Sequence, residues 1–236
     1  MNVMWFSAGV SSAITLWLAR NEIDQVIYQH IDDQHTDTMR FIKDISRLVD
    51  KTVVIRQSSY RSVENVCRSF KYINGARGAK CTEILKKRER KEWESDNPGD
   101  HTYYWGFDAS NREFMRAKKL MEAMPKNNHR FPLIDHGLTK DDAHAMLLKL
   151  GIKRPVMYDL GYHNNNCVGC VKGGKKYWNM IRSDFPDVFA SRSRLERSIG
   201  HSCINGVFLD ELDPDSGKNE DLIELECGIM CWGALQ

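Results

Sequence analysis

The first 55 residues alternate between short apolar runs and segments of helical periodicity, and this alternation restricts the fold more than any other feature. An apolar run at residues 4–6 leads into the small-residue turn Ser7-Ala8-Gly9-Val10-Ser11-Ser12 and then into a helical stretch. A second run at 25–31, a helix at 36–49 and a third run at 52–55 repeat the order. Strands that alternate with helices predict an α/β fold with a doubly wound, mostly parallel, Rossmann-like sheet.

The rest of the chain extends this pattern and then changes texture. We expect a fourth strand at 101–107 and a final short strand at 131–134. Further helices are expected at residues 62–70, 82–94, 112–124, 139–150, 175–182 and 186–199. After Pro155 the sequence becomes rich in Gly, Asn and Cys, so we predict a nucleotide-binding domain at 1–155 and a Cys-containing C-terminal extension at 156–236.

Charge and cysteine usage narrow the class of protein. The net charge of +2 does not by itself indicate a polyanion partner, although basic residues gather between Arg68 and Lys91. No basic leader and no apolar run of about 20 residues is visible, which favours a cytoplasmic protein without a membrane partner. Seven cysteines in such a chain favour thiol, metal or cluster chemistry over a disulfide framework.

The turn after the first strand is the first candidate site. Ligands of open α/β sheets bind beyond the carboxyl ends of the strands, where a helix start offers backbone N–H groups to an anion. The turn has neither the Walker A spacing nor GxGxxG, so by itself it is compatible with an ordinary turn as well as with a phosphate site. The candidate residues are Ser7, Ala8, Gly9, Ser11 and Ser12.

Two cysteine elements are the second candidate site. Cys81 lies at a predicted helix start that Thr82 could cap, with Lys80 and Lys86 nearby, and thiols in such positions are good nucleophiles or ligands. Cys167 and Cys170 form a CxxC flanked by glycines, a pattern typical of metal or cluster ligation. Four thiolates suit zinc and [4Fe-4S] alike, so ligand type leaves both open.

Together these motifs resemble the PP-loop superfamily, and most closely its phosphoadenosine phosphosulfate (PAPS) reductase branch. The turn is similar to the signature Ser-Gly-Gly-x-Asp-Ser, the segment from Cys81 to Lys86 to Cys-Thr-x-x-x-Lys, and Trp105-Gly106-Phe107 to a strand end that precedes a nucleotide-binding arginine. The resemblance implies an adenine nucleotide (PAPS, APS or ATP) bound by the turn with Lys80, Lys86, Gly106, Arg112 and Arg116. Ser11 stands where ATP-cleaving members have Asp, which disfavours ordinary ATP activation.

Cluster-bearing relatives in this branch pair a mid-chain cysteine element with a downstream CxxC. The resemblance therefore implies a [4Fe-4S] cluster on Cys81, Cys167 and Cys170. Those relatives have adjacent cysteines at the first element, whereas Thr82 follows Cys81 here. The fourth ligand is Cys231 or Cys203, or else one iron stays open, as in cluster-dependent tRNA thiolases of the superfamily.

The tail Glu226-Cys227-Gly228 resembles the Glu-Cys-Gly-Leu-His tail of sulfonucleotide reductases. The resemblance implies that Cys227 is the catalytic nucleophile and that a thioredoxin-like protein donates electrons. Cys227 and Cys231 serve equally well as ligands.

Three functions remain open at this stage. The first is a sulfonucleotide reductase-like oxidoreductase, and the second is an ATP-dependent enzyme that transfers sulfur to RNA or DNA or otherwise modifies it. The third is a zinc-stabilised nucleotide-binding module without catalysis. A homo-oligomer is compatible with all three.

Overall fold

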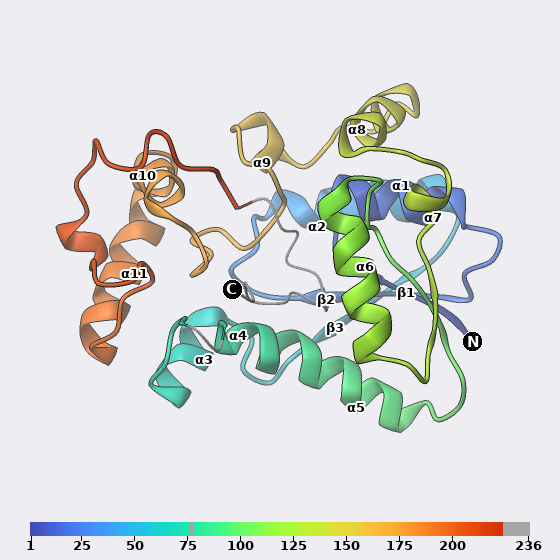
Figure 1. Ribbon diagram of the computed structural model, residues 1–236, viewed down its shortest axis with the longest axis horizontal. Helices are drawn as coiled ribbons and strands as arrows, with labels where there is room; N and C mark the ends of the chain where they lie inside the picture. The colour runs from blue at the N-terminus through green and yellow to red at the C-terminus, as the bar shows by residue number, and fades with distance from the viewer. Residues whose placement is uncertain (76–77, 224–236) are drawn as a thin grey trace. The chain divides into compact units, whose positions relative to one another are not determined.

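The computed structural model describes residues 1–75 and 78–223, which form two compact units (Figure 1). Unit 1 comprises Met1–Gln29, Thr36–Arg56 and Trp93–Leu160. Unit 2 comprises His30–His35, Gln57–Glu92 and the described residues from Gly161 onward. The CxxC segment therefore belongs to the same unit as two stretches from the first half of the chain. The predicted boundary after residue 155 stays a prediction.

A parallel five-stranded sheet forms the centre of unit 1. Its strands are β1 (Asn2–Phe6), β2 (Gln25–His30), β3 (Val53–Gln57), β4 (Thr102–Tyr104) and β5 (Asn128–Arg130). The order is β3-β2-β1-β4-β5, and Met4 pairs with Val26 on one side and Tyr104 on the other. The predicted α/β fold is confirmed. The chain adds β2 and β3 on one side of β1 and then crosses over to add β4 and β5 on the other side. The topological switch point therefore lies between β1 and β4.

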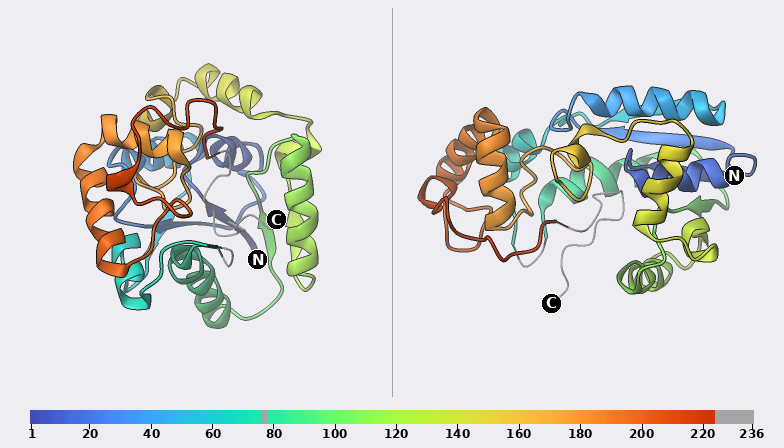
Figure 2. Two further views of the ribbon diagram at one scale, coloured as in Figure 1. Left: turned by 60° about the vertical axis from the view of Figure 1, so that its left-hand side comes forward. Right: turned by 90° about the horizontal axis from the view of Figure 1, so that it is seen from above.

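Helices cover both faces of this sheet (Figure 2). The helical segments are α1 (Val10–Leu18), α2 (Asp37–Val49), α5 (Glu89–Asp96), α6 (Asn111–Ala123), α7 (Pro132–Asp135), α8 (Lys140–Lys149) and α9 (Val156–Asp159). Met4 and Phe6 join the core formed with α1, α2 and α8. Trp5 points to the other face, as strand alternation requires, and its ring contacts Trp93 of α5 at 5.8 Å between centroids.

One predicted strand was wrong. Residues 131–134 contain the short helix α7, and the fifth strand is Asn128–Arg130. Pro132 occupies the start of α7, where its fixed φ and missing N–H suit a first helical turn. The predicted N-cap of α8 is confirmed, because Thr139 and Asp142 form a capping box.

Unit 2 is built from short helices and long connections. Its helical segments are α3 (Val63–Phe70), α4 (Lys80–Thr82), the π-helical turn η1 (Glu83–Arg88), α10 (Lys175–Asp184), α11 (Pro186–Ile199) and the 3₁₀ turn η2 (Leu209–Glu211). Helices α10 and α11 pack together around the fully buried Trp178. The prediction that Thr82 caps the helix after Cys81 was wrong, since that helix begins at Lys80 with Ala79 as its N-cap.

Among the helices in the described part of the chain, none is long and apolar enough to cross a membrane.

Candidate functional site

The turn after β1 is cross-linked by its own serines. Ser7 Oγ donates to Ser12 Oγ at 2.8 Å, and Ser12 Oγ donates to the carbonyl oxygen of Gly9 at 2.9 Å. The N–H of Gly9 donates to Ser7 Oγ at 3.3 Å. Ala8 has a φ of 58°, in the left-handed region that glycine adopts at lower cost. These bonds stabilise a tight turn that leads directly into α1.

The segment after β4 touches the start of α1. A Cβ added to Gly106 would lie 2.7 Å from Ser12 Cα and 2.8 Å from Ser12 N, closer than Cβ atoms come to backbone atoms in proteins. Gly106 is therefore needed for the segment after β4 to come this close to α1. Ser11, which precedes Ser12, is buried in the first turn of α1. The structure brings the five predicted turn residues together with Gly106 at the switch point of unit 1, where α/β folds bind ligands.

The two predicted arginines lie in the first turns of α6. Arg116 Nη1 donates to Glu113 Oε1 at 2.6 Å and stacks over the ring of Phe107, with 4.6 Å between Cζ and the centroid. Arg112 is more exposed, and its Nε lies 3.8 Å from the same carboxylate. Glu113 thus holds the more buried arginine, whereas Arg112 is the more exposed of the two.

The cysteine elements meet in unit 2. A small cavity of about 10 Å³ is lined by Ile31, Val63, Cys81, Thr82, Lys86, Cys167, Cys170, Val171 and Lys172. The structure thereby brings Cys81 together with the CxxC, and it adds Lys86, which is buried although it is a lysine. Lys80 does not line this cavity, because it pairs with Glu83 at 2.8 Å and lies over the ring of Phe70.

Thr82 is the unexpected member of this cavity. Its side chain is buried, with 4% exposed, and its Oγ1 has no hydrogen-bond partner among the described residues. Over residues 1–75 and 78–223, no three His, Cys, Asp or Glu side chains form a group that could hold one metal ion. The three thiols nevertheless line one cavity.

The backbone of the CxxC loop is held by Tyr177 of α10. Tyr177 Oη accepts a hydrogen bond from the N–H of Cys170 at 2.8 Å and donates one to the carbonyl oxygen of Cys167 at 3.1 Å. Gly169, between the two cysteines, has a φ of 71°, which a side chain would strain. Burial raises the pKa of Tyr177 well above its ordinary value, so its hydroxyl stays protonated and keeps both bonds.

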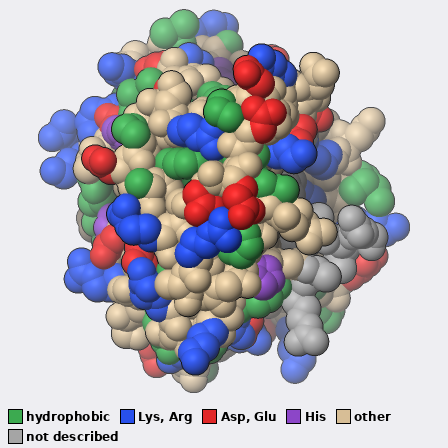
Figure 3. Space-filling view, turned by 90° about the vertical axis from the view of Figure 1, so that its left-hand side faces the viewer, with side chains coloured by type: hydrophobic (Ala, Val, Ile, Leu, Met, Phe, Trp, Pro, Cys, Tyr) green, Lys and Arg blue, Asp and Glu red, His purple; other side chains and the backbone are tan. Residues whose placement is uncertain are grey.

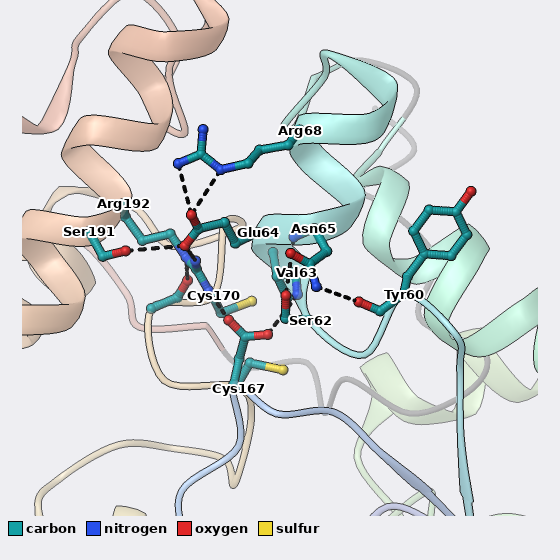
Figure 4. Close-up of polar contacts among 12 residues, drawn as sticks. Tyr60, Ser62, Val63, Glu64, Asn65, Arg68, Cys167, Cys170, Ser191 and Arg192 are labelled. Carbon is teal, nitrogen blue, oxygen red and sulfur yellow. Dashed lines mark hydrogen bonds and ion pairs between the residues drawn. The ribbon is translucent and has the colours of Figure 1, made fainter.

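A buried ion pair ties the same loop to α3 and α11 (Figure 4). Arg192 pairs with Asp33 and donates to the carbonyl oxygen of Gly169, while the Asp33 carboxylate accepts the N–H of Val63 at 2.6 Å. Burial disfavours the charged guanidinium, but the Asp33 carboxylate outweighs it, and the pKa of Arg192 is raised. Figure 4 also shows the thiols of Cys167 and Cys170 on the same side of their loop.

Sequence reasoning missed Asp33, Tyr177 and Arg192 as members of this site. Asp33 could have been predicted, because it follows the second strand and polar residues that face a ligand gather at strand ends. Nothing local marks Arg192, whose partner is 159 positions away.

Two of the remaining cysteines are buried outside this cavity, and the other two lie outside the described residues. Burial raises the pKa of Cys67 to about 11. Burial, reinforced by the Glu196 carboxylate, also raises the pKa of Cys203, and Glu196 accepts the N–H of Cys203. Neither thiol lines the cavity of Cys81. The predicted nucleophile Cys227 and the predicted ligand Cys231 lie outside the described residues.

Several side chains of the basic stretch between Arg68 and Lys91 pair with acids. Arg68 contacts Glu64 at 2.8 Å, and Arg88 contacts Glu92 at 2.6 Å. On the face shown in Figure 3, basic and acidic side chains are interspersed. Such a surface is typical of a solvated, ion-paired exterior.

A comparison with protein families matches residues 1–174 to the phosphoadenosine phosphosulfate reductase domain. The match covers well over half of the 236 residues and includes the turn after β1, Cys81 and the CxxC. Among the curated proteins, none matches the chain.

Proposed function

Because the chain belongs to the phosphoadenosine phosphosulfate reductase domain family, we propose that it is an enzyme that binds an adenine sulfonucleotide and carries out thiol-based sulfur redox chemistry. We further propose an iron–sulfur cluster on Cys81, Cys167 and Cys170. The observation that carries the proposal is the shared cavity of these three thiols with the buried Lys86.

The turn after β1 supports the nucleotide half of the proposal. It leads into the N-terminus of α1, which carries the positive end of the helix dipole toward an anion. Gly106 keeps the space beside Ser12 free of a side chain. Arg112, half exposed on α6, supplies a guanidinium fork that suits phosphate or sulfate. Nucleotide binding in this unit depends on these residues.

The resemblance favours a cluster over a single zinc ion, because cluster-bearing relatives pair a mid-chain cysteine element with a downstream CxxC. Here the corresponding residues Cys81, Cys167 and Cys170 line one cavity. Lys86 and Lys172 line the same cavity. Such a centre would supply thiolate-bound, redox-active iron.

The proposed reaction proceeds by thiol exchange on sulfur. The thiolate of Cys227 attacks the sulfate sulfur of the bound nucleotide, so that an S–S bond forms, the S–O bond to phosphate breaks, and the nucleotide phosphate leaves with the electron pair. A dithiol donor of the thioredoxin type then attacks Cys227 Sγ and displaces sulfite. The second donor thiol closes a disulfide and regenerates Cys227, so the dithiol supplies both electrons.

Sulfite release tests this reaction. The full chain with PAPS or APS and reduced thioredoxin should release sulfite, and Cys227→Ser should abolish the release. Cys67→Ala is the matched control, because Cys67 is buried away from the cavity, and it should retain the wild-type rate. Undetectable sulfite from wild type, or undiminished sulfite from Cys227→Ser, contradicts the mechanism.

Iron analysis tests the cluster separately. Protein purified without oxygen should be brown and contain iron and acid-labile sulfide. Serine variants of Cys81, Cys167 and Cys170 should each lose most of the iron, and Cys67→Ala should keep it. Stoichiometric zinc in a colourless protein would instead support the zinc-stabilised module.

The same preparations distinguish the ATP-dependent alternative. That enzyme should convert ATP to AMP or ADP only when RNA or DNA is present, and should release no sulfite from PAPS or APS. Ser11 in place of Asp in the turn speaks against this result.

A further inference from the structure

The two edges of the sheet in unit 1 differ in how they are protected. Natural edge strands avoid pairing with other chains by being short, polar or charged. β5 follows this rule, because its three residues are Asn128, His129 and Arg130. β3, at the opposite edge, leaves Val54 38% exposed and Ile55 50% exposed. This edge therefore has the apolar character that an edge strand in contact with solvent normally avoids.

The backbone along the outer side of β3 is open as well. β3 has β2 as its neighbour on one side and no strand on the other. Over residues 1–75 and 78–223, no turn, loop or cap hydrogen bond uses the backbone of Val53, Val54 or Ile55. A row of outward N–H and C=O groups beside exposed apolar side chains is a template for one more strand.

The residues of β3 suit a second copy of the same strand. Antiparallel pairing about a two-fold axis at Ile55 places that side chain directly opposite its symmetry mate. Val54 then lies opposite Arg56, and Val53 lies opposite Gln57. No like charges meet across the two strands, and the aliphatic stem of Arg56 can cover Val54 of the other copy. An acidic partner strand would find only one cation on β3, so the charge pattern favours the second copy.

We propose that β3 is a homodimer interface, along which two copies pair antiparallel and join their sheets into one. The five residues of β3 span about 17 Å at a rise of about 3.3 Å per residue. One strand pair of this length buries less surface than a permanent dimer requires, so the association is reversible and its dissociation constant is micromolar. The inference goes beyond the proposed function and does not depend on it, because β3 contributes no residue to the nucleotide turn or to the thiol cavity.

Sedimentation velocity of the full chain at about 1 to 200 µM measures this association. The wild type should pass from monomer toward dimer as its concentration rises. Ile55→Lys places like charges opposite each other across the two-fold axis and should weaken dimerisation about tenfold or more. Leu148→Lys is the matched control, because it makes a similar change at a leucine that is 78% exposed on α8, which packs on α1. It should dimerise like the wild type.

A complementary pair of variants tests the two-fold geometry. Ile55→Glu alone should also stay monomeric, but an equimolar mixture with Ile55→Lys should form a heterodimer, because the carboxylate and the ammonium then face each other. Mixing cannot rescue an unfolded chain, so recovery separates lost pairing from lost folding.

A wild type that stays monomeric over the whole concentration range overturns the inference. Dimerisation that Ile55→Lys leaves unchanged, or that Leu148→Lys weakens equally, also overturns it. A mixture that remains monomeric overturns the pairing about Ile55 and with it the proposed interface. The sulfite and iron assays decide the proposed function separately, so either proposal can fail without the other.

Discussion

Gly106→Ala offers the most direct test of how unit 1 builds its ligand site. The backbone φ of Gly106 is one that any residue can adopt, so the substitution tests space and not backbone strain. The new Cβ would lie 2.7, 2.8 and 2.9 Å from Ser12 Cα, N and Cβ. Carbon atoms pack at about 3.5 Å or more, so the two segments must separate by about 0.8 Å.

That separation acts on the turn as well as on stability. Ser12 belongs to a buried helix and cannot move away freely, and overpacking of this kind costs about 1–3 kcal/mol of unfolding free energy. The bond between Ser7 Oγ and Ser12 Oγ is 2.8 Å long. If most of the separation of about 0.8 Å were added to this Oγ–Oγ distance, the distance would exceed the range of a hydrogen bond. We therefore expect the affinity for PAPS and ATP to fall about tenfold or more, equivalent to about 1.4 kcal/mol.

Urea unfolding and calorimetric titration with each nucleotide measure the two effects. Gly137→Ala is the control, because its φ of 64° strains an added side chain while nothing lies within 4 Å of the new Cβ. It should lose about 1–2 kcal/mol of stability and leave nucleotide affinity unchanged. The reasoning is refuted if Gly106→Ala unfolds and binds like the wild type, or if both variants weaken binding equally.

Three further substitutions or treatments address unit 2. Tyr177→Phe leaves the buried N–H of Cys170 without its acceptor and should cost about 1–3 kcal/mol in urea unfolding, together with part of the bound iron. Arg192→Met leaves the Asp33 carboxylate buried and unpaired and should cost about 3–5 kcal/mol, with partial recovery when Asp33→Asn is added; full stability of the single variant would contradict the role of the pair. With a pKa of about 11, about one Cys67 in a thousand is a thiolate at pH 8, so iodoacetamide should modify it only after unfolding, as peptide mass spectrometry would show.

The fold was largely predictable because its main determinants are local. Apolar runs that alternate with helical periodicity identified β1, β2, β3 and β4, and the small-residue turn identified the start of α1. The fifth strand escaped prediction because Asn128–Arg130 is polar, whereas the apolar run beside it contains Pro132 and forms a helix. Periodicity cannot identify a strand that is only three polar residues long.

The site was predictable to the extent that single residue types carry its chemistry. Cys81 and the CxxC stood out in the sequence because thiols in such spacing have few structural uses, and the structure places them on one cavity. The pair of Asp33 and Arg192 did not stand out, because its members are far apart in the chain and each has an ordinary neighbourhood.

Ser11 shows how a departure from a family pattern acquires meaning from its place in the fold. The resemblance sets Ser11 where ATP-cleaving relatives have Asp, and the structure places it, buried, in the first turn of α1. The nucleotide turn therefore lacks a carboxylate that could bind Mg²⁺. Thr82, by contrast, matches the Cys-Thr-x-x-x-Lys element, so it marks no such loss. Because Mg²⁺ neutralises the charge that develops when ATP is cleaved, the missing carboxylate favours the proposed sulfonucleotide chemistry over cleavage of ATP.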